Sequence, residues 1–179
     1  MTLRSAAAAL AAGATIIALA ACTGPSGSAA PAPTVLPVAE NPITNDSTEP
    51  GLEVVLAAVE DNEDPETGQP ISDRLQLILR NTTDRTLEDL EVFYVMTDVE
   101  TGESEGYHQD LGDLTIPAGA ETAVYFDNES GEGHYPENQF SLYRSSANQV
   151  DFEIEVSASG VQVAHATASK EAGTGEEAD

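Results

Sequence analysis

The sequence predicts an all-β domain, an antiparallel sandwich of seven to eight short strands, spanning residues 51–169. Two observations predict it: apolar side chains recur at every second position, and turn-forming residues separate these runs at short intervals. No segment carries a convincing stripe of apolar residues at helical spacing, as an amphipathic helix would require. Several short strands with this spacing are typical of a two-sheet sandwich.

The alternation is clearest in two segments. Residues 74–81 place leucine at positions 75, 77 and 79, and residues 150–157 place an apolar side chain at every even position. Such alternation indicates strands with one face on a core and the other in water. In the middle of residues 90–97, apolar side chains occupy odd and even positions alike. This pattern predicts a central strand covered on both faces. The other strands are expected at 52–60, 106–112, 121–127, 139–144 and 161–167.

The residues between these strands carry a resemblance to a known family. Asn81-x-Thr83 follows a strand, Leu87-x-Asp89-Leu90-x-Val92-x-Tyr94 comes next, Gly102 closes an acidic turn, and Ile116-Pro117-x-Gly119 leads into another strand. This arrangement resembles bacterial extracellular immunoglobulin-like modules of the FxLYD type. The resemblance implies an immunoglobulin-like sandwich and brings no activity with it. The chain differs from antibody-type domains because it has one cysteine and no tryptophan, so no disulfide can join the sheets.

The N-terminal residues have the layout of a bacterial export signal. Arg4 precedes an alanine-rich apolar run that ends in Leu19-Ala20-Ala21-Cys22. These four residues resemble the lipobox of bacterial lipoproteins, which implies cleavage between Ala21 and Cys22 and a diacylglycerol thioether on the Cys22 sulfur. We therefore expect a signal peptide over residues 1–21 and an extracytoplasmic protein anchored to the outer face of the cell membrane. The alternative is an ordinary signal peptide that contains a cysteine.

Two segments outside the domain are expected to be disordered. Residues 22–50 are rich in Pro, Ser and Ala without hydrophobic periodicity, which predicts a flexible linker between the lipid and the domain. Residues 170–179 predict an acidic disordered tail. The whole chain also resembles uncharacterised lipoproteins of actinobacteria, and its abundance of alanine and preference for arginine over lysine indicate a high-GC genome.

The charge of the chain restricts its partners. Without the signal peptide, five basic residues oppose 32 acidic ones, which gives a net charge of −27. Nucleic acid is excluded as a partner because its binding requires cationic contacts to phosphates. Direct binding to anionic head groups or wall polymers is disfavoured for the same reason. The lipid is the expected membrane contact, an envelope protein or glycan is the expected partner, and the protein is expected to be a monomer.

Acidic residues in predicted loops are candidate metal ligands. They are Asp61, Glu63 and Asp64 in one loop and Asp127 and Glu129 in another, and a further acidic segment covers residues 98–103. Calcium requires six to eight converging oxygen atoms, which loops at one end of a sandwich can supply. No cofactor is expected, with calcium as the possible exception; a transition metal would require the fold to bring His108, His134 and His165 together. The alternative is that these carboxylates form an ordinary solvated surface.

The segment 131–138 is the candidate binding loop. It combines two glycines with His134, Tyr135 and Asn138, which offer aromatic and polar contacts. Long loops in compact domains often carry function, although a purely connecting loop is the alternative. No motif for a nucleophile elbow, a zinc protease or a phosphate loop is present. The expected function is therefore a non-enzymatic binding or envelope-accessory module; the alternatives are a calcium-binding domain and a hydrolase.

Overall fold

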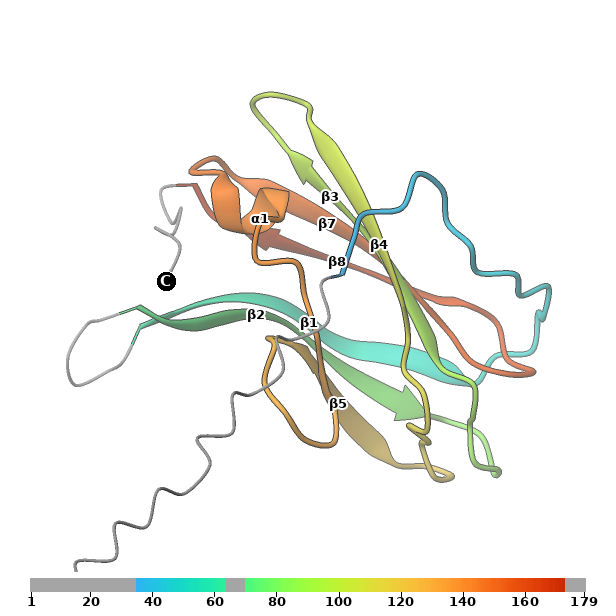
Figure 1. Cartoon of the computed structure of the whole chain (residues 1–179). Helices are drawn as coiled ribbons and strands as arrows, with labels where there is room; N and C mark the ends of the chain where they lie inside the picture. Colours follow the sequence, from blue (N-terminus) through green and yellow to red (C-terminus); the bar gives the residue numbers. More distant parts are fainter. Residues whose placement is uncertain (1–34, 64–69, 173–179) are drawn as a thin grey trace, which may run out of the picture. The chain divides into compact units, whose positions relative to one another are not determined.

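The computed structural model describes residues 35–63 and 70–172, with the backbone alone for residues 60–63 and 70–74. This part of the chain forms eight strands and one short helix (Figure 1). In chain order they are β1 (Leu52–Glu63), β2 (Pro70–Asn81), β3 (Glu91–Asp98), β4 (Ser104–Asp110), β5 (Glu121–Phe126), β6 (His134–Tyr135), α1 (Leu142–Ser145), β7 (Val150–Ser157) and β8 (Ala164–Lys170). Among the described residues, no helix is long and apolar enough to cross a membrane.

The strands form two four-stranded sheets, in the orders β1-β2-β5-β6 and β4-β3-β7-β8. Every strand pair is antiparallel except β5 with β6, which pair in parallel over two residues. The structure confirms the prediction of an all-β sandwich of seven to eight strands. It also confirms that residues 90–97 contain a central strand, because β3 lies between β4 and β7.

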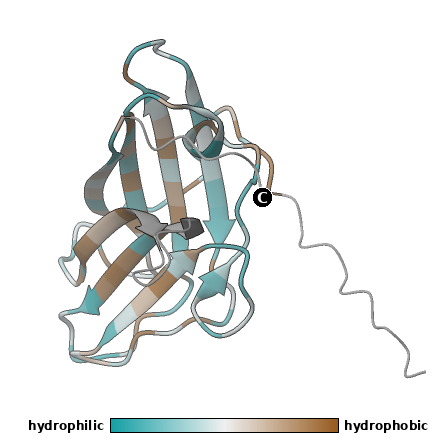
Figure 2. Cartoon of the chain, turned by 90° about the vertical axis from the view of Figure 1, so that its left-hand side faces the viewer, coloured by the Kyte–Doolittle hydropathy of each residue, from teal (hydrophilic) through white to brown (hydrophobic). Residues whose placement is uncertain are grey.

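The core lies between the two sheets, where the alternating apolar residues of each strand face inward. Figure 2 shows this pattern as hydrophobic and hydrophilic bands along the strands. Tyr94 of β3 is at the centre, 1% exposed. Its ring lies 5.6 Å from that of Tyr107, 5.5 Å from Phe126 and 6.3 Å from Phe152. Phe126 belongs to the opposite sheet, so its contact with Tyr94 joins the two sheets of a domain that has no disulfide.

One strand prediction is wrong. Residues 139–144 were expected to form a strand, but Leu142–Ser145 form the helix α1. Leu142 and Tyr143 are adjacent and both buried, whereas a strand would place neighbouring side chains on opposite faces. The Tyr143 ring packs edge-on against Phe152 at 5.8 Å.

Residues 35–50, which we call the strap, differ from the flexible linker predicted there. The Val38 amide donates a 2.7 Å hydrogen bond to the Gly106 carbonyl of β4. A Cβ atom on Gly106 would lie 3.1 Å from the Val38 carbonyl oxygen, so glycine makes this approach possible. The Asn45 side-chain amide donates to three acceptors beside β7: the Ser157 hydroxyl at 3.0 Å, the Ala158 carbonyl at 3.3 Å and the Val161 carbonyl at 2.9 Å.

The C-terminal boundary also differs from the prediction by one residue. Lys170, expected to begin the disordered tail, ends β8 and is 3% exposed. Its ammonium group donates to the Tyr143 carbonyl at 2.8 Å and to the Ser146 carbonyl. The signal peptide, Cys22 and residues 173–179 lie outside the described residues.

Candidate functional site

The loop of residues 127–141, which follows β5 and contains β6, holds most of the candidate residues. Its backbone reverses through Asn128 at φ 60°, Gly131 at φ 139° and Gly133 at φ 83°. A Cβ atom on Gly133 would lie only 2.8 Å from the Ala123 carbonyl oxygen of β5. Glycine is therefore required there for β6 to approach β5, and the Gly133 carbonyl accepts a 2.8 Å hydrogen bond from the Tyr125 amide.

Asp127 and His134 form a fixed pair within this loop. The two carboxylate oxygens of Asp127 lie 3.1 and 3.0 Å from Nδ1 of His134. The Asp127 side chain has no exposed surface, and the His134 side chain is 22% exposed. The imidazole also stacks on the Tyr125 ring, 5.0 Å away with an interplanar angle of 21°. The ring is thus oriented from two directions.

Glu129 completes a group of three potential metal ligands. Its Oε2 lies 3.9 Å from Nδ1 of His134, on a side chain that is 55% exposed. One ligating atom from each of Asp127, Glu129 and His134 lies within 4.8 Å of the others. The structure therefore joins two acidic candidates to a histidine from the predicted binding loop. An imidazole with two carboxylates does not match calcium, which takes six to eight oxygen ligands.

The remaining acidic candidates do not belong to this group. Asp61 and Glu63 were expected in a loop, but their backbone extends β1. β2 separates β1 from β5 in the sheet, and the side chains of both residues lie outside the described part. Asp64 is not among the described residues.

Two further residues of the predicted binding loop support its conformation. The Tyr135 hydroxyl donates to the Leu111 carbonyl at 2.9 Å. The Asn138 side-chain amide donates to the Tyr107 hydroxyl at 3.0 Å, and its oxygen accepts from the Phe140 amide at 2.9 Å. Asn138 is therefore engaged inside the protein.

A buried ion pair that no sequence pattern predicts holds the same loop. Glu137 is 6% exposed and pairs with Arg144 of α1. The Glu137 amide donates to the Asn128 side-chain oxygen at 2.9 Å, and Gln109 of β4 donates to the Pro136 carbonyl at 2.7 Å. These contacts tie the loop to both β4 and α1.

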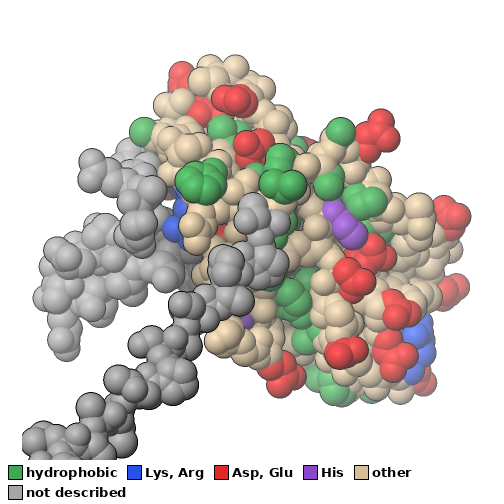
Figure 3. Space-filling view, in the orientation of Figure 1, with side chains coloured by type: hydrophobic (Ala, Val, Ile, Leu, Met, Phe, Trp, Pro, Cys, Tyr) green, Lys and Arg blue, Asp and Glu red, His purple; other side chains and the backbone are tan. Residues whose placement is uncertain are grey.

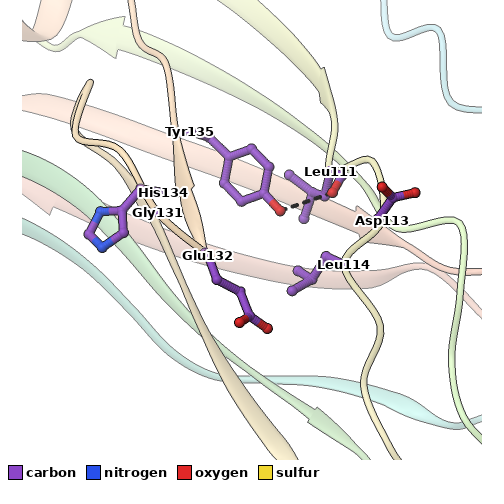
Figure 4. Close-up of a pocket in the computed structure, with 8 residues that line it drawn as sticks. Leu111, Asp113, Leu114, Gly131, Glu132, His134 and Tyr135 are labelled. Carbon is purple, nitrogen blue, oxygen red and sulfur yellow. Dashed lines mark hydrogen bonds between the residues drawn. The ribbon is translucent and has the colours of Figure 1, made fainter.

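A cavity of about 310 Å³ opens between this loop and the turn after β4 (Figure 4). Leu111, Leu114 and the Tyr135 ring line it, and the exposed Asp113 and Glu132 also contribute to its lining. Figure 4 shows Tyr135 pointing toward the Leu111 side, while its neighbour His134 points the other way. Further residues that line the cavity are Gly131, Gly133 and His134.

The cavity lies in an acidic environment. Burial first, and then the negative charges of Asp110 and Glu132, raise the pKa of Tyr135. Figure 3 shows acidic side chains spread over one face of the domain, with few basic ones. A cation is therefore the charge that this environment favours.

The acidic segment 98–103 has a structural role. The Asp98 carboxylate accepts hydrogen bonds from the Ser146 hydroxyl at 2.6 Å and from the Asn148 amide at 3.0 Å. It also accepts from the amides of Glu100 and Thr101 at 2.9 and 2.8 Å. These bonds, led by the one from Ser146, hold the pKa of Asp98 well below its usual range.

The pair of Asp127 and His134 resembles the orienting half of a catalytic triad, in which a buried carboxylate binds Nδ1 of a histidine. Among the described residues, no serine or threonine hydroxyl is hydrogen-bonded to Nε2 of His134.

No protein-family model matches the chain, and no curated protein matches it either. The chemistry of the site itself must therefore carry the functional interpretation.

Proposed function

We propose that this protein is a lipoprotein, anchored through Cys22 to the outer face of the cell membrane, that binds an envelope protein at the cavity beside the 127–141 loop. Residues 19–22 support the anchor, because they have the lipobox pattern. The observation that carries the binding function is the cavity, with apolar and aromatic walls on a loop that is held rigidly.

The strap limits the distance between the domain and the membrane. Because it packs on the sandwich from Val35 onward, the connection between lipid and domain consists of residues 22–34 rather than 22–50. Thirteen residues span at most about 45 Å, whereas the 29 residues of the longer segment would span about 100 Å. The domain would thus engage partners close to the membrane surface.

The cavity favours a basic side chain of the partner. Leu111, Leu114 and the Tyr135 ring suit an alkyl stem, and Asp113 and Glu132 suit its positive charge. The four described basic side chains all have internal partners. Arg80 pairs with Glu121, Arg85 with the Ser159 and Gly160 carbonyls, Arg144 with Glu137, and Lys170 with the Tyr143 carbonyl.

Carbodiimide cross-linking in isolated envelopes tests this proposal, because the reagent joins a carboxylate directly to a contacting amine. We expect cross-links between Asp113 or Glu132 and a lysine of one envelope protein, lost in the D113N/E132Q variant. The matched control is E100Q/E103Q, which neutralises two exposed carboxylates in the β3–β4 turn and should leave these cross-links unchanged.

Binding of the purified partner should also weaken as salt rises, because an exposed charge contact is screened. Recovery of the same partner with D113N/E132Q as with the native protein would contradict the proposed cavity. Cross-links confined to Glu100 and Glu103 would contradict it equally.

A further inference from the structure

We infer that Asp127, His134 and Glu129 bind a divalent first-row transition-metal ion such as Zn²⁺. This inference goes beyond the proposed partner binding, because it uses the other side of the loop from the Tyr135 ring. Its basis is the geometry of the three side chains, their chemistry and the rigidity of the loop that carries them.

The distance between the two best-fixed ligands already suits a metal. Nδ1 of His134 and Oδ2 of Asp127 are 3.0 Å apart. Zinc–nitrogen and zinc–oxygen bonds are about 2.1 Å long, so two ligands of one ion are about 3.0 Å apart at a right angle and about 3.4 Å apart at the tetrahedral angle that zinc prefers. Binding would replace the contact between these two atoms with the ion, and rotation of the two side chains can supply the small separation that tetrahedral geometry requires.

Glu129 supplies the third ligand from solvent. Its carboxylate is 3.9 Å from Nδ1 of His134 and its side chain is 55% exposed, so rotation about its own bonds can bring it to the ion. Its backbone amide donates to Oδ1 of Asp127 at 3.0 Å. That bond fixes the Asp127 carboxylate and leaves Oδ2 available to face His134.

The donor set selects the class of metal. Imidazole is a preferred ligand of zinc, copper, iron and nickel, whereas calcium and magnesium prefer oxygen alone. Three protein ligands also leave positions for water or a partner group. The site is thus expected to discriminate against Ca²⁺ and Mg²⁺, although the surface of the domain is strongly acidic.

Another histidine provides a matched comparison. His108 of β4 has Nε2 at 2.9 Å from Oε2 of Glu91, so it also forms a histidine–carboxylate pair. Among the described residues, the group of three potential ligands contains His134 and does not contain His108. His108 therefore controls for the histidine–carboxylate contact itself.

The test is titration of the mature chain, residues 22–179, with Zn²⁺ by calorimetry and with Co²⁺ by absorption. A large excess of Mg²⁺ suppresses diffuse binding to carboxylates, and Cys22→Ser in every sample removes a thiol ligand. We expect one site, weakened at least tenfold by His134→Gln and by Glu129→Gln, and unchanged by His108→Gln. Co²⁺ should give ligand-field bands that disappear in His134→Gln.

Zn²⁺ binding with the same affinity in His134→Gln as in the native protein would overturn the inference. Displacement of Zn²⁺ by equimolar Ca²⁺, or no Zn²⁺ binding above the Mg²⁺ background, would overturn it equally. Circular dichroism of each variant establishes that it is folded, and a misfolded His134→Gln is replaced by His134→Asn in the same titration. None of these results depends on Asp113 or Glu132, so the failure of the metal site and the failure of the cavity are distinguishable.

Discussion

The side-chain amide of Asn81 donates a 2.8 Å hydrogen bond to the carbonyl oxygen of Ile116. Asn81 is completely buried at the end of β2, and its amide also donates to the carbonyls of Arg85 and Pro117. Its side-chain oxygen accepts from the amide and the hydroxyl of Thr83 at 2.8 and 2.7 Å. The Asn81-x-Thr83 motif thus joins two connections of the sandwich.

Asn81→Ala is expected to lower the free energy of unfolding by about 2–4 kcal/mol, because several buried backbone groups lose a partner. Urea unfolding measures this change. The control is Asn41→Ala, which removes two exposed hydrogen bonds, one to Glu155 and one from the Ile43 amide, and should change stability by less than about 0.5 kcal/mol. Similar losses in both variants would contradict the structural role of Asn81.

The low pKa of Asp98 gives a pH dependence with a definite sign. Hydrogen bonds to its carboxylate depress the pKa in the folded protein, so this contribution is complete above the unfolded pKa of about 3.9. It is lost as the pH falls below that value toward the folded pKa. The stability difference between the native protein and Asp98→Asn should therefore be larger at pH 7 than at pH 3. A difference that is independent of pH would contradict this explanation.

Gly133→Ala is expected to destabilise the protein more than Gly112→Ala. Both glycines have positive φ angles, 83° and 59°, so alanine is strained at each. Only at Gly133 would the new Cβ meet a backbone oxygen, at 2.8 Å, whereas nothing lies within 4 Å at Gly112. We expect an additional loss of at least about 1 kcal/mol for Gly133→Ala in urea unfolding. Equal losses would show that β6 does not pack closely on β5.

The strap should be protected from hydrogen exchange. The Val38 amide bonds to the Gly106 carbonyl and the Gln162 amide bonds to the Glu49 carbonyl, so both should exchange slowly in the native protein. Asn45→Ala removes the three hydrogen bonds to residues 157–161 and the one from the Ser47 amide. It should accelerate exchange across residues 36–50, while exchange in β7 stays slow. Rapid exchange of Val38 in the native protein would mean that the strap is not bound.

The sandwich was predictable because the alternation of apolar and polar residues within a strand indicates which of its faces is buried. The buried face of β2 consists of Leu75, Leu77 and Leu79. The apolar residues at even positions from Val150 to Val156 form the buried face of β7 in the same way. The strand predicted for residues 139–144 was wrong because the apolar residues of this segment fit a short strand as well as a helical turn. Whether Leu142 and Tyr143 are buried together depends on contacts with distant strands, which no local pattern encodes.

Long-range polar contacts were not predictable from the same patterns. Asn45 lies in a segment without periodicity, and its acceptors are more than a hundred residues away in the chain. The site was predicted in parts: Asp127 and Glu129 as acidic ligands and His134 as a loop residue. Their convergence depends on the turn at Gly131 and Gly133, whose geometry the sequence does not specify. The resemblance to FxLYD-type modules stays a prediction.

Mass spectrometry of the N-terminal peptide from isolated membranes tests the lipid anchor, the central claim, most directly. We expect a peptide that begins at Cys22 and carries a diacylglycerol thioether, and we expect Cys22→Ala to appear in the soluble fraction with its fold intact. An unmodified Cys22, a retained segment 1–21, or a Cys22→Ala protein that remains membrane-bound would contradict the account.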